Sequence, residues 1–302
     1  MPSWKITALA SKAAVEAALA RQELVPDWPG DVVVSGSETA EDRPEEWRLE
    51  MWLPRKPDAA DQARAKALFG RPAPRLSVER LADEDWVSLS QQGAQPIVAG
   101  RFRVRTPEHA ASGDPALTEF VIPTSLAFGT GQHGTTAGCL AMLDRMRREG
   151  VVARDIADIG TGTGLLAFAA LALWPHARAT ATDIDPVCAD VVHANAAANR
   201  VREGAGTGAL ATIVADGMDD PLIAARGPYD LLIANILAGP LIDLAPDFAH
   251  AVPPGGHVVL AGLLETQEPA VRRAYRHHGF RLARRLVNGD WSILWLRRSG
   301  VR

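Results

Sequence analysis

Cysteines and long apolar runs are scarce in this chain of 302 residues, and each scarcity excludes a class of protein. Cys139 and Cys188 are the only cysteines, which gives neither a disulfide framework nor a cysteine metal site. No apolar run reaches the roughly 18 residues of a membrane span, and charges are scattered through Met1–Ala20. We therefore expect a cytoplasmic protein with no signal peptide, no membrane contact and no bound metal.

Positive charge is not in excess either, because 36 aspartates and glutamates outnumber 32 lysines and arginines, for a net charge of −4. This balance disfavours direct nucleic-acid binding and is compatible with a basic protein partner. A Ser-His-Asp order, a cluster of metal ligands and a Gly-Lys-Ser phosphate loop are also missing. Apolar residues are plentiful at 47%, and the length suits two domains with substantial cores.

The first 84 residues alternate between strand-like and helix-like patterns in the order β-α-β-β-α-β. That order is the split βαβ pattern, so we expect a small ferredoxin-like α+β domain over residues 1–84. A small sheet of this kind usually presents a surface for recognition. The expected elements are Trp4–Leu9, Ser11–Gln22, Asp31–Val34, Glu46–Leu53, Asp58–Phe69 and Arg75–Leu81.

Residues 85–302 are expected to form the second domain. A linker-like stretch, Asp83–Gly100, leads to a strand pair at Arg101–Val104 and Glu119–Ile122. Helices and strands then alternate, which predicts a parallel α/β sheet, and Asn288-Gly289 predicts a terminal hairpin that inserts an antiparallel strand. The expected helices are Thr135–Arg148, Gly164–Leu173, Pro186–Asn199, Pro240–Ala251 and Thr266–His278; the expected strands are Asp155–Ile159, Arg178–Thr182, Ala211–Val214, Asp230–Ala234, His257–Leu260, Phe280–Val287 and Trp291–Leu296.

A glycine-rich turn between a strand and a helix carries the clearest functional signal. Residues 158–164 read Asp-Ile-Gly-Thr-Gly-Thr-Gly, and Gly160 and Gly162 let a ligand approach bare backbone. Asp183 follows at the end of the next strand, where a carboxylate can accept hydrogen bonds from a ribose. The third glycine, Gly164, comes one residue earlier than in a dinucleotide fingerprint. This spacing favours an adenosyl group over a pyrophosphate.

Other polar residues end the neighbouring strands. Asp185 before Pro186 is interpreted as a helix N-cap, which leaves Asp183 free for a ligand. Asp216 can accept from an adenine amino group, or it is a turn residue before Gly217. Asn235 can hold a substrate amine or the amino-acid part of a cofactor, because its amide both donates and accepts; the alternative is a turn-initiating residue.

A second glycine-rich loop, Leu126–Thr136, opens the first helix of this domain. Thr135 or Thr136 can cap that helix or offer a hydroxyl to a ligand. His133 is a tempting base, but a single histidine in such a loop is more often a hydrogen-bonding loop residue.

At these motifs the chain resembles a known family. The 158–164 turn with Asp183 is similar to the cofactor site of class I S-adenosylmethionine-dependent methyltransferases, a very large superfamily. Leu126–Thr136, Thr182–Pro186 and Ala234–Pro240 resemble a much narrower group, the ribosomal protein L11 methyltransferase family. The resemblance covers about residues 85–302, and the preceding part matches in size and element order.

The resemblance implies a Rossmann-like class I methyltransferase sheet and S-adenosylmethionine as cofactor. It implies methylation of amino groups, both lysine side chains and an N-terminal amine, on ribosomal protein L11, which the N-terminal domain would recognise. We expect a monomeric enzyme. The candidate cofactor-binding residues are Thr136, Gly160, Asp183 and Asn235 from the resemblance, with Gly162 and Asp216 from the glycine turn and the third strand.

Methyl transfer to an amine mainly requires alignment of a neutral nitrogen with the methyl carbon. A free lysine has a pKa of about 10.4, and desolvation lowers it. We expect Leu126 and Phe128 to line an apolar channel and Asn235 to orient the nitrogen, and we assign no general base. The acidic residues Glu38, Glu41, Asp42, Glu45 and Glu46 would meet a basic partner, although a solvated loop is the simpler interpretation.

Three alternatives remain open at this point. The chain could be a class I methyltransferase of another protein or of a small molecule. It could be a nicotinamide-dependent oxidoreductase, against which the position of Gly164 argues. It could also be a binding module without activity, in which Gly160, Asp183 and Asn235 would have no purpose.

Overall fold

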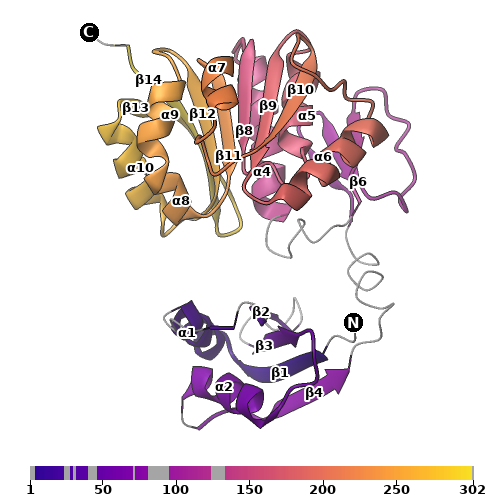
Figure 1. Ribbon diagram of the computed structural model, residues 1–302, viewed down its shortest axis with the longest axis vertical. Coiled ribbons are helices and arrows are strands. Elements are labelled where there is room, and N and C mark those ends of the chain that lie inside the picture. The colour runs from indigo at the N-terminus through magenta and orange to yellow at the C-terminus, as the bar shows by residue number, and fades with distance from the viewer. Residues whose placement is uncertain are drawn as a thin grey trace. The chain divides into compact units, whose positions relative to one another are not determined.

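The computed structural model describes residues 4–23, 28–29, 32–39, 46–70, 72–80, 95–123 and 133–300. Backbone contacts divide the chain into two compact units, Met1–Gly93 and Ala94–Arg302, shown in Figure 1. The two units are described separately.

The N-terminal unit is an antiparallel sheet in the strand order β2-β3-β1-β4, which confirms the predicted β-α-β-β-α-β sequence of elements. Val15 and Ala18 of the first helix and Leu68 of the second pack in one core with Ile6 and Met51 of the sheet. Its elements are β1 (Trp4–Ser11), α1 (Lys12–Glu23), β2 (Val33–Glu38), β3 (Glu46–Leu53), α2 (Ala59–Phe69) and β4 (Leu76–Arg80).

Local signals place the ends of α2. Asp58 is the N-cap and accepts from the Asp61 N–H, while the Asp61 carboxylate accepts from the Asp58 N–H, so the two form a capping box. The helix ends at Gly70, as predicted. Asp61 is also buried and paired with Arg55, and this hydrogen bond is the main reason that its pKa is lowered.

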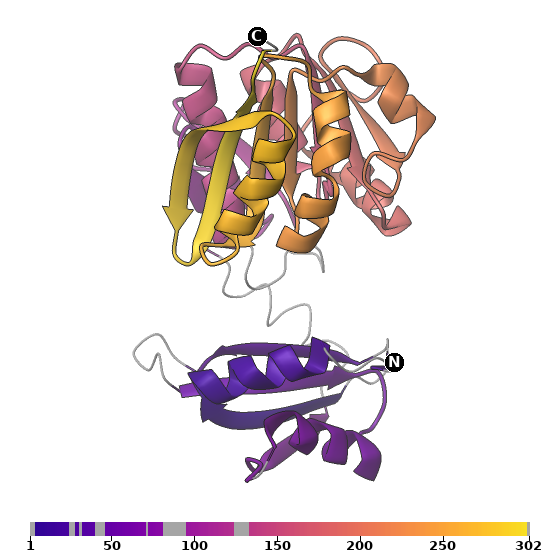
Figure 2. The same ribbon diagram turned by 90° about the vertical axis from the view of Figure 1, so that its left-hand side faces the viewer.

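The C-terminal unit is built on a mixed sheet, in which the described residues form seven strands in the order β10-β9-β8-β11-β12-β14-β13. The first five strands run parallel, and β14 is antiparallel to both neighbours, as the predicted terminal hairpin requires. The hairpin lies at one edge of the sheet, in yellow in Figure 2. The strands are β8 (Asp155–Ile159), β9 (Arg178–Asp183), β10 (Ala209–Val214), β11 (Leu231–Asn235), β12 (His257–Leu264), β13 (Phe280–Asn288) and β14 (Trp291–Arg298).

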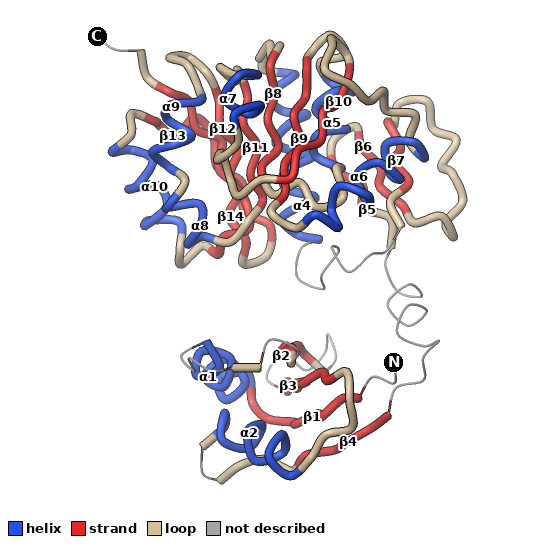
Figure 3. Tube along the Cα trace, in the orientation of Figure 1, coloured by secondary structure: helices blue, strands red, loops and turns tan. Residues whose placement is uncertain are grey.

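Helices cover both faces of this sheet (Figure 3). In β11, Leu231 and Ile233 enter one core and Leu232 and Ala234 enter the other, because successive side chains point to opposite faces. The first core contains α4 (His133–Arg148), α5 (Leu165–Leu173) and α6 (Pro186–Ala198), and the second contains α7 (Pro221–Arg226), α8 (Ala238–Asp243), α9 (Ala245–Ala251) and α10 (Glu268–His277).

The structure corrects the prediction for the stretch before the large sheet. The linker-like segment Asp83–Gly100 contains a strand, β5 (Ile97–Ala99), antiparallel to β6 (Phe102–Arg105). The predicted partner of β6 is β7 (Thr118–Val121), and this pair is parallel. The connection between β6 and β7 can return alongside because residues 106–117 are long enough to cross over.

One helix prediction was wrong, and one helix was missed. The single helix expected at Pro240–Ala251 is divided into α8 and α9 at Leu244, since Pro246 has no N–H for the helical ladder and stands in the first turn of α9. Helix α7 was not predicted at all. Its N-cap Asp220 followed by Pro221 is the same signal that marked Asp185 and Pro186.

Candidate active site

The predicted ligand residues follow adjacent strands of the large sheet. Strands β9, β8 and β11 are neighbours, and Ile159 pairs with both Thr182 and Ala234. The register therefore brings Gly160, Asp183 and Asn235 to the same carboxyl edge. This edge is where open α/β sheets bind ligands.

The glycine turn depends on the absence of side chains. Gly160 has a φ of +70°, and a Cβ there would lie 2.3 Å from Cγ2 of Ile236. Gly162 also has a positive φ, +54°. A larger residue at position 160 would push the Ile236 side chain out of its place, so the turn and the residue after Asn235 pack as a pair.

The Asp183 carboxylate is hydrogen-bonded to the turn, whereas the sequence had suggested that it would be free. Its Oδ2 accepts from the Gly162 N–H at 2.9 Å, and its Oδ1 accepts from the Asp185 N–H at 3.1 Å. Each carboxylate oxygen has two lone pairs, so both oxygens keep capacity for a ligand hydroxyl. The other prediction here is confirmed, because Asp185 caps α6 by accepting from the Val187 N–H.

Asp158 lies at the glycine turn, and the sequence analysis did not single it out as a candidate. Its carboxylate is buried, and Oδ2 accepts from the Thr161 hydroxyl at 2.7 Å and from the Ala167 N–H at 3.1 Å. Oδ1 has no hydrogen-bond partner among the described residues. Burial raises the pKa of Asp158 to about 6. The available signal was an acidic residue two positions before the first glycine of Gly-x-Gly.

This raised pKa predicts a pH effect on stability. The folded state binds the Asp158 proton more tightly than the unfolded state, whose pKa is near 3.8, so this stabilisation is present at low pH and is lost as the pH rises through about 6. Relative to Asp158→Asn, the wild type should lose about 2 kcal/mol of unfolding free energy between pH 4 and pH 7. Urea unfolding at several pH values measures this. Asp219→Asn, at an exposed position, should follow the wild type, whereas parallel curves for Asp158→Asn and wild type would contradict the assignment.

The remaining candidates are tied less closely to the turn. Asn235 is half-buried at the end of β11, and its side chain makes no hydrogen bond within the described part of the chain. Asp216 is exposed after β10, and its carbonyl accepts from the Asp219 N–H, as in the alternative turn interpretation. Thr136 is buried in the first turn of α4, which packs against β11, β12 and the terminal hairpin. The expected channel residues Leu126 and Phe128 and the side chain of His133 lie outside the described residues.

A nucleoside without a pyrophosphate fits this edge of the sheet. Gly160 leaves space that a Cβ would fill, Asp183 has acceptor capacity for hydroxyls, and Asp158 has an orphaned buried oxygen beside the turn. Residues 156–167 contain no lysine or arginine to neutralise a pyrophosphate. The described residues also hold no group of three potential metal ligands and no helix long and apolar enough to cross a membrane.

Comparison with known proteins agrees with this geometry. The family model described as "Ribosomal protein L11 methyltransferase (PrmA)" matches residues 20–299. The chain belongs to this family. Its members include a ribosomal protein L11 methyltransferase of Mesorhizobium japonicum, 41% identical over 78% of this chain and 80% of that protein. Another, from Agrobacterium fabrum, is 35% identical over 92% of this chain and 94% of that protein.

A solved structure of the same family has the same fold. The ribosomal protein L11 methylase of Lactobacillus delbrueckii subsp. bulgaricus superimposes with a TM-score of 0.56 at 28% identity, covering 68% of this chain and 99% of that one. The chain is therefore an S-adenosylmethionine-dependent protein methyltransferase by family, with the α/β architecture of that class. This is the enzyme class that the position of Gly164 favoured over a nicotinamide-dependent oxidoreductase.

Proposed function

We propose that S-adenosylmethionine binds at the carboxyl edge of β8, β9 and β11. The observation that carries this proposal is the hydrogen bond from the Gly162 N–H to Asp183, which holds a bare backbone turn beside a carboxylate with spare acceptor capacity. Gly160 and Gly162 would lie along the cofactor and Asp183 would accept from its ribose. Asp216 would accept from the adenine amino group, and Thr136 and Asn235 would contact the amino-acid part.

We further propose that the substrate is ribosomal protein L11, which the relatives' names give as their target. The N-terminal unit would recognise it. The sheet face with Lys5, Arg48, Glu50 and Glu79 has a shallow hollow of about 490 Å³. Lys5 pairs with both glutamates there, at 2.9 and 2.8 Å, so the surface offers charges of both signs to a protein. Glu38 and Glu46 of the predicted acidic stretch are exposed, and residues 41–45 lie outside the described part.

The protein contributes to methyl transfer mainly by positioning the reacting groups. When bound, S-adenosylmethionine supplies an activated methyl group on a sulfonium. The chain has to present a neutral amine, and exclusion of water lowers a lysine pKa from its usual value of about 10.4. The Asn235 amide oxygen would accept from the amine N–H and so aim the nitrogen lone pair. We assign no side chain as general base.

A labelling experiment tests substrate and activity together. We expect that the protein, incubated with methyl-labelled S-adenosylmethionine and ribosomal proteins from cells lacking this enzyme, puts label on the L11 band alone. Asp183→Ala should give no label under the same conditions. Label on another protein or only on small molecules would reject the substrate but keep the enzyme class.

A further inference from the structure

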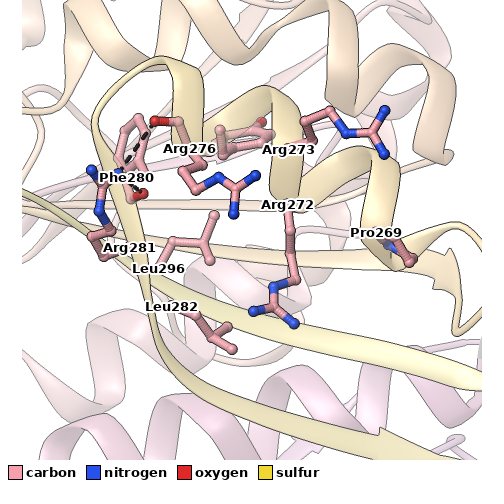
Figure 4. Close-up of a pocket in the computed structure, with 9 residues that line it drawn as sticks. Pro269, Arg272, Arg273, Arg276, Phe280, Arg281, Leu282 and Leu296 are labelled. Carbon is pink, nitrogen blue, oxygen red and sulfur yellow. Dashed lines mark hydrogen bonds between the residues drawn. The ribbon is translucent and has the colours of Figure 1, made fainter.

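A hollow of about 380 Å³ lies between α10 and the strands β13 and β14 (Figure 4). It is separate from the cofactor edge, because β11, β12 and β14 lie between β8 and β13 in the sheet. The lining combines arginines with an apolar floor: Arg272, Arg273, Arg276, Arg281, Leu282 and Leu296, with Tyr275, Phe280 and Pro269.

The charge around this hollow is opposite to that of the whole chain. The segment Glu268–Arg298 has eight arginines and only two carboxylates, Glu268 and Asp290, in a protein with a net charge of −4. Four of those arginines line the one hollow. Like charges held together repel, so a cluster of this kind is stabilised by an anion.

Carboxylates of the protein do not neutralise most of this cluster. Arg272 donates to Glu268 at 3.1 Å, but among the described residues Arg281 donates only to the carbonyls of Arg276 and Phe280. The side chains of Arg273 and Arg276 have no partner among the described residues, and both are exposed. Figure 4 shows Arg272 and Arg276 extending from the helix toward Leu282 and Leu296.

The floor of the hollow contains a second unpaired group. Tyr275 is fully buried, and its hydroxyl has no hydrogen-bond partner in the described part of the chain. Its ring packs against Phe280 and Phe248, so the residue is fixed in place. Because this hydroxyl is fully buried, Tyr275 adds only ring surface to the floor of the hollow.

We propose that this hollow, the arginine pocket, binds the phosphate group of a nucleotide. Guanidinium forks match phosphate oxygens in pairs, and the volume lies in the range of small-ligand sites. The apolar residues Leu282 and Leu296 suit the body of an organic phosphate better than they suit an inorganic ion. Because these arginines line a compact pocket and not a long basic groove, the site also favours a single nucleotide unit. The nucleotide is either free or part of an RNA strand.

Binding of three probes tests the proposal: inorganic tripolyphosphate, ADP and a short fluorescent oligouridylate. We expect ADP to bind and its affinity to fall with added salt, since exposed charges are screened. Arg273→Gln with Arg276→Gln should weaken that binding at least about tenfold, as expected for the loss of two charge-assisted contacts. Arg147→Gln, an exposed arginine of α4, is the matched control and should not change it.

The outcomes separate the sources of phosphate. Loss of ADP binding in the double variant identifies a free nucleotide, and loss of RNA binding alone identifies a nucleotide within a strand. S-adenosylmethionine affinity and circular dichroism should be unchanged, and the single variant Arg273→Gln gives the same answer if the double variant is poorly folded. Equal binding by wild type and variants, or no binding of any probe by the wild type, would overturn the proposal whatever the fate of the substrate assignment.

Discussion

Asp183→Ala is expected to weaken S-adenosylmethionine binding at least about 100-fold. Hydrogen bonds to a charged group contribute about 1.5–3 kcal/mol each, and the substitution would remove the proposed bonds from the ribose hydroxyls to the carboxylate. The substitution would also leave the Gly162 N–H without the acceptor to which it donates at 2.9 Å, so the turn beside Gly160 would lose its fixed shape. Isothermal titration calorimetry with S-adenosylmethionine measures the loss directly.

The neighbouring carboxylate provides the control for this change. Asp185→Ala removes the cap of α6, where Asp185 accepts from the Val187 N–H, and should cost about 1 kcal/mol of stability. Its cofactor affinity should stay within a few-fold of wild type. Equal losses of affinity in the two variants would mean that Asp183 acts through helix stability and not by contact.

Gly262→Ala is expected to lower the unfolding free energy by about 3 kcal/mol and to abolish methyl transfer. Gly262 has a φ of +84° in β12, and a Cβ there would lie 2.2 Å from the Ile236 carbonyl oxygen. The strained φ costs about 1–2 kcal/mol and the overlap a further 1–3 kcal/mol. Ile236 is also the residue that occupies the space beside Gly160, so its displacement would move Asn235 and the glycine turn together.

Gly279→Ala separates the cost of the strained φ from the cost of the steric overlap. Gly279 has the same φ of +84°, but a Cβ there would meet nothing within 4 Å. This variant should lose only about 1–2 kcal/mol in chemical denaturation and should keep its methyl transfer. If Gly279→Ala and Gly262→Ala were equally destabilised and equally active, the contact with Ile236 would be unimportant.

The sequence predicted best where local chemistry decides the structure. The cap at Asp185, the end of α2 at Gly70, the hairpin at Gly289 and the strand Asp155–Ile159 all follow from neighbouring residues. The parallel sheet with an antiparallel strand inserted by the terminal hairpin also followed, because alternating strands and helices favour a parallel sheet.

The sequence predicted less of the structure where contacts between distant segments determine it. Strand β5 has three residues and exists only because β6 pairs with it. The isolation of the Asp158 Oδ1 depends on packing around the whole turn, which no pattern of residue types reveals. The gathering of four arginines at one hollow likewise requires α10 to lie on the terminal hairpin. The cofactor-binding roles of all six candidates stay predictions: Thr136, Gly160, Gly162, Asp183, Asp216 and Asn235.

The position of β14 has a consequence for how the protein is made on the ribosome. Strand β14 is synthesised after β13 but is inserted between β13 and β12. While the nascent chain grows, β12 therefore keeps an open edge of backbone N–H and C=O groups, although β8, β9 and β11 have all been made. Open edges of this kind pair readily with other chains. A product that stops before Trp291 would carry the complete glycine turn and Asp183, and would still be prone to aggregate.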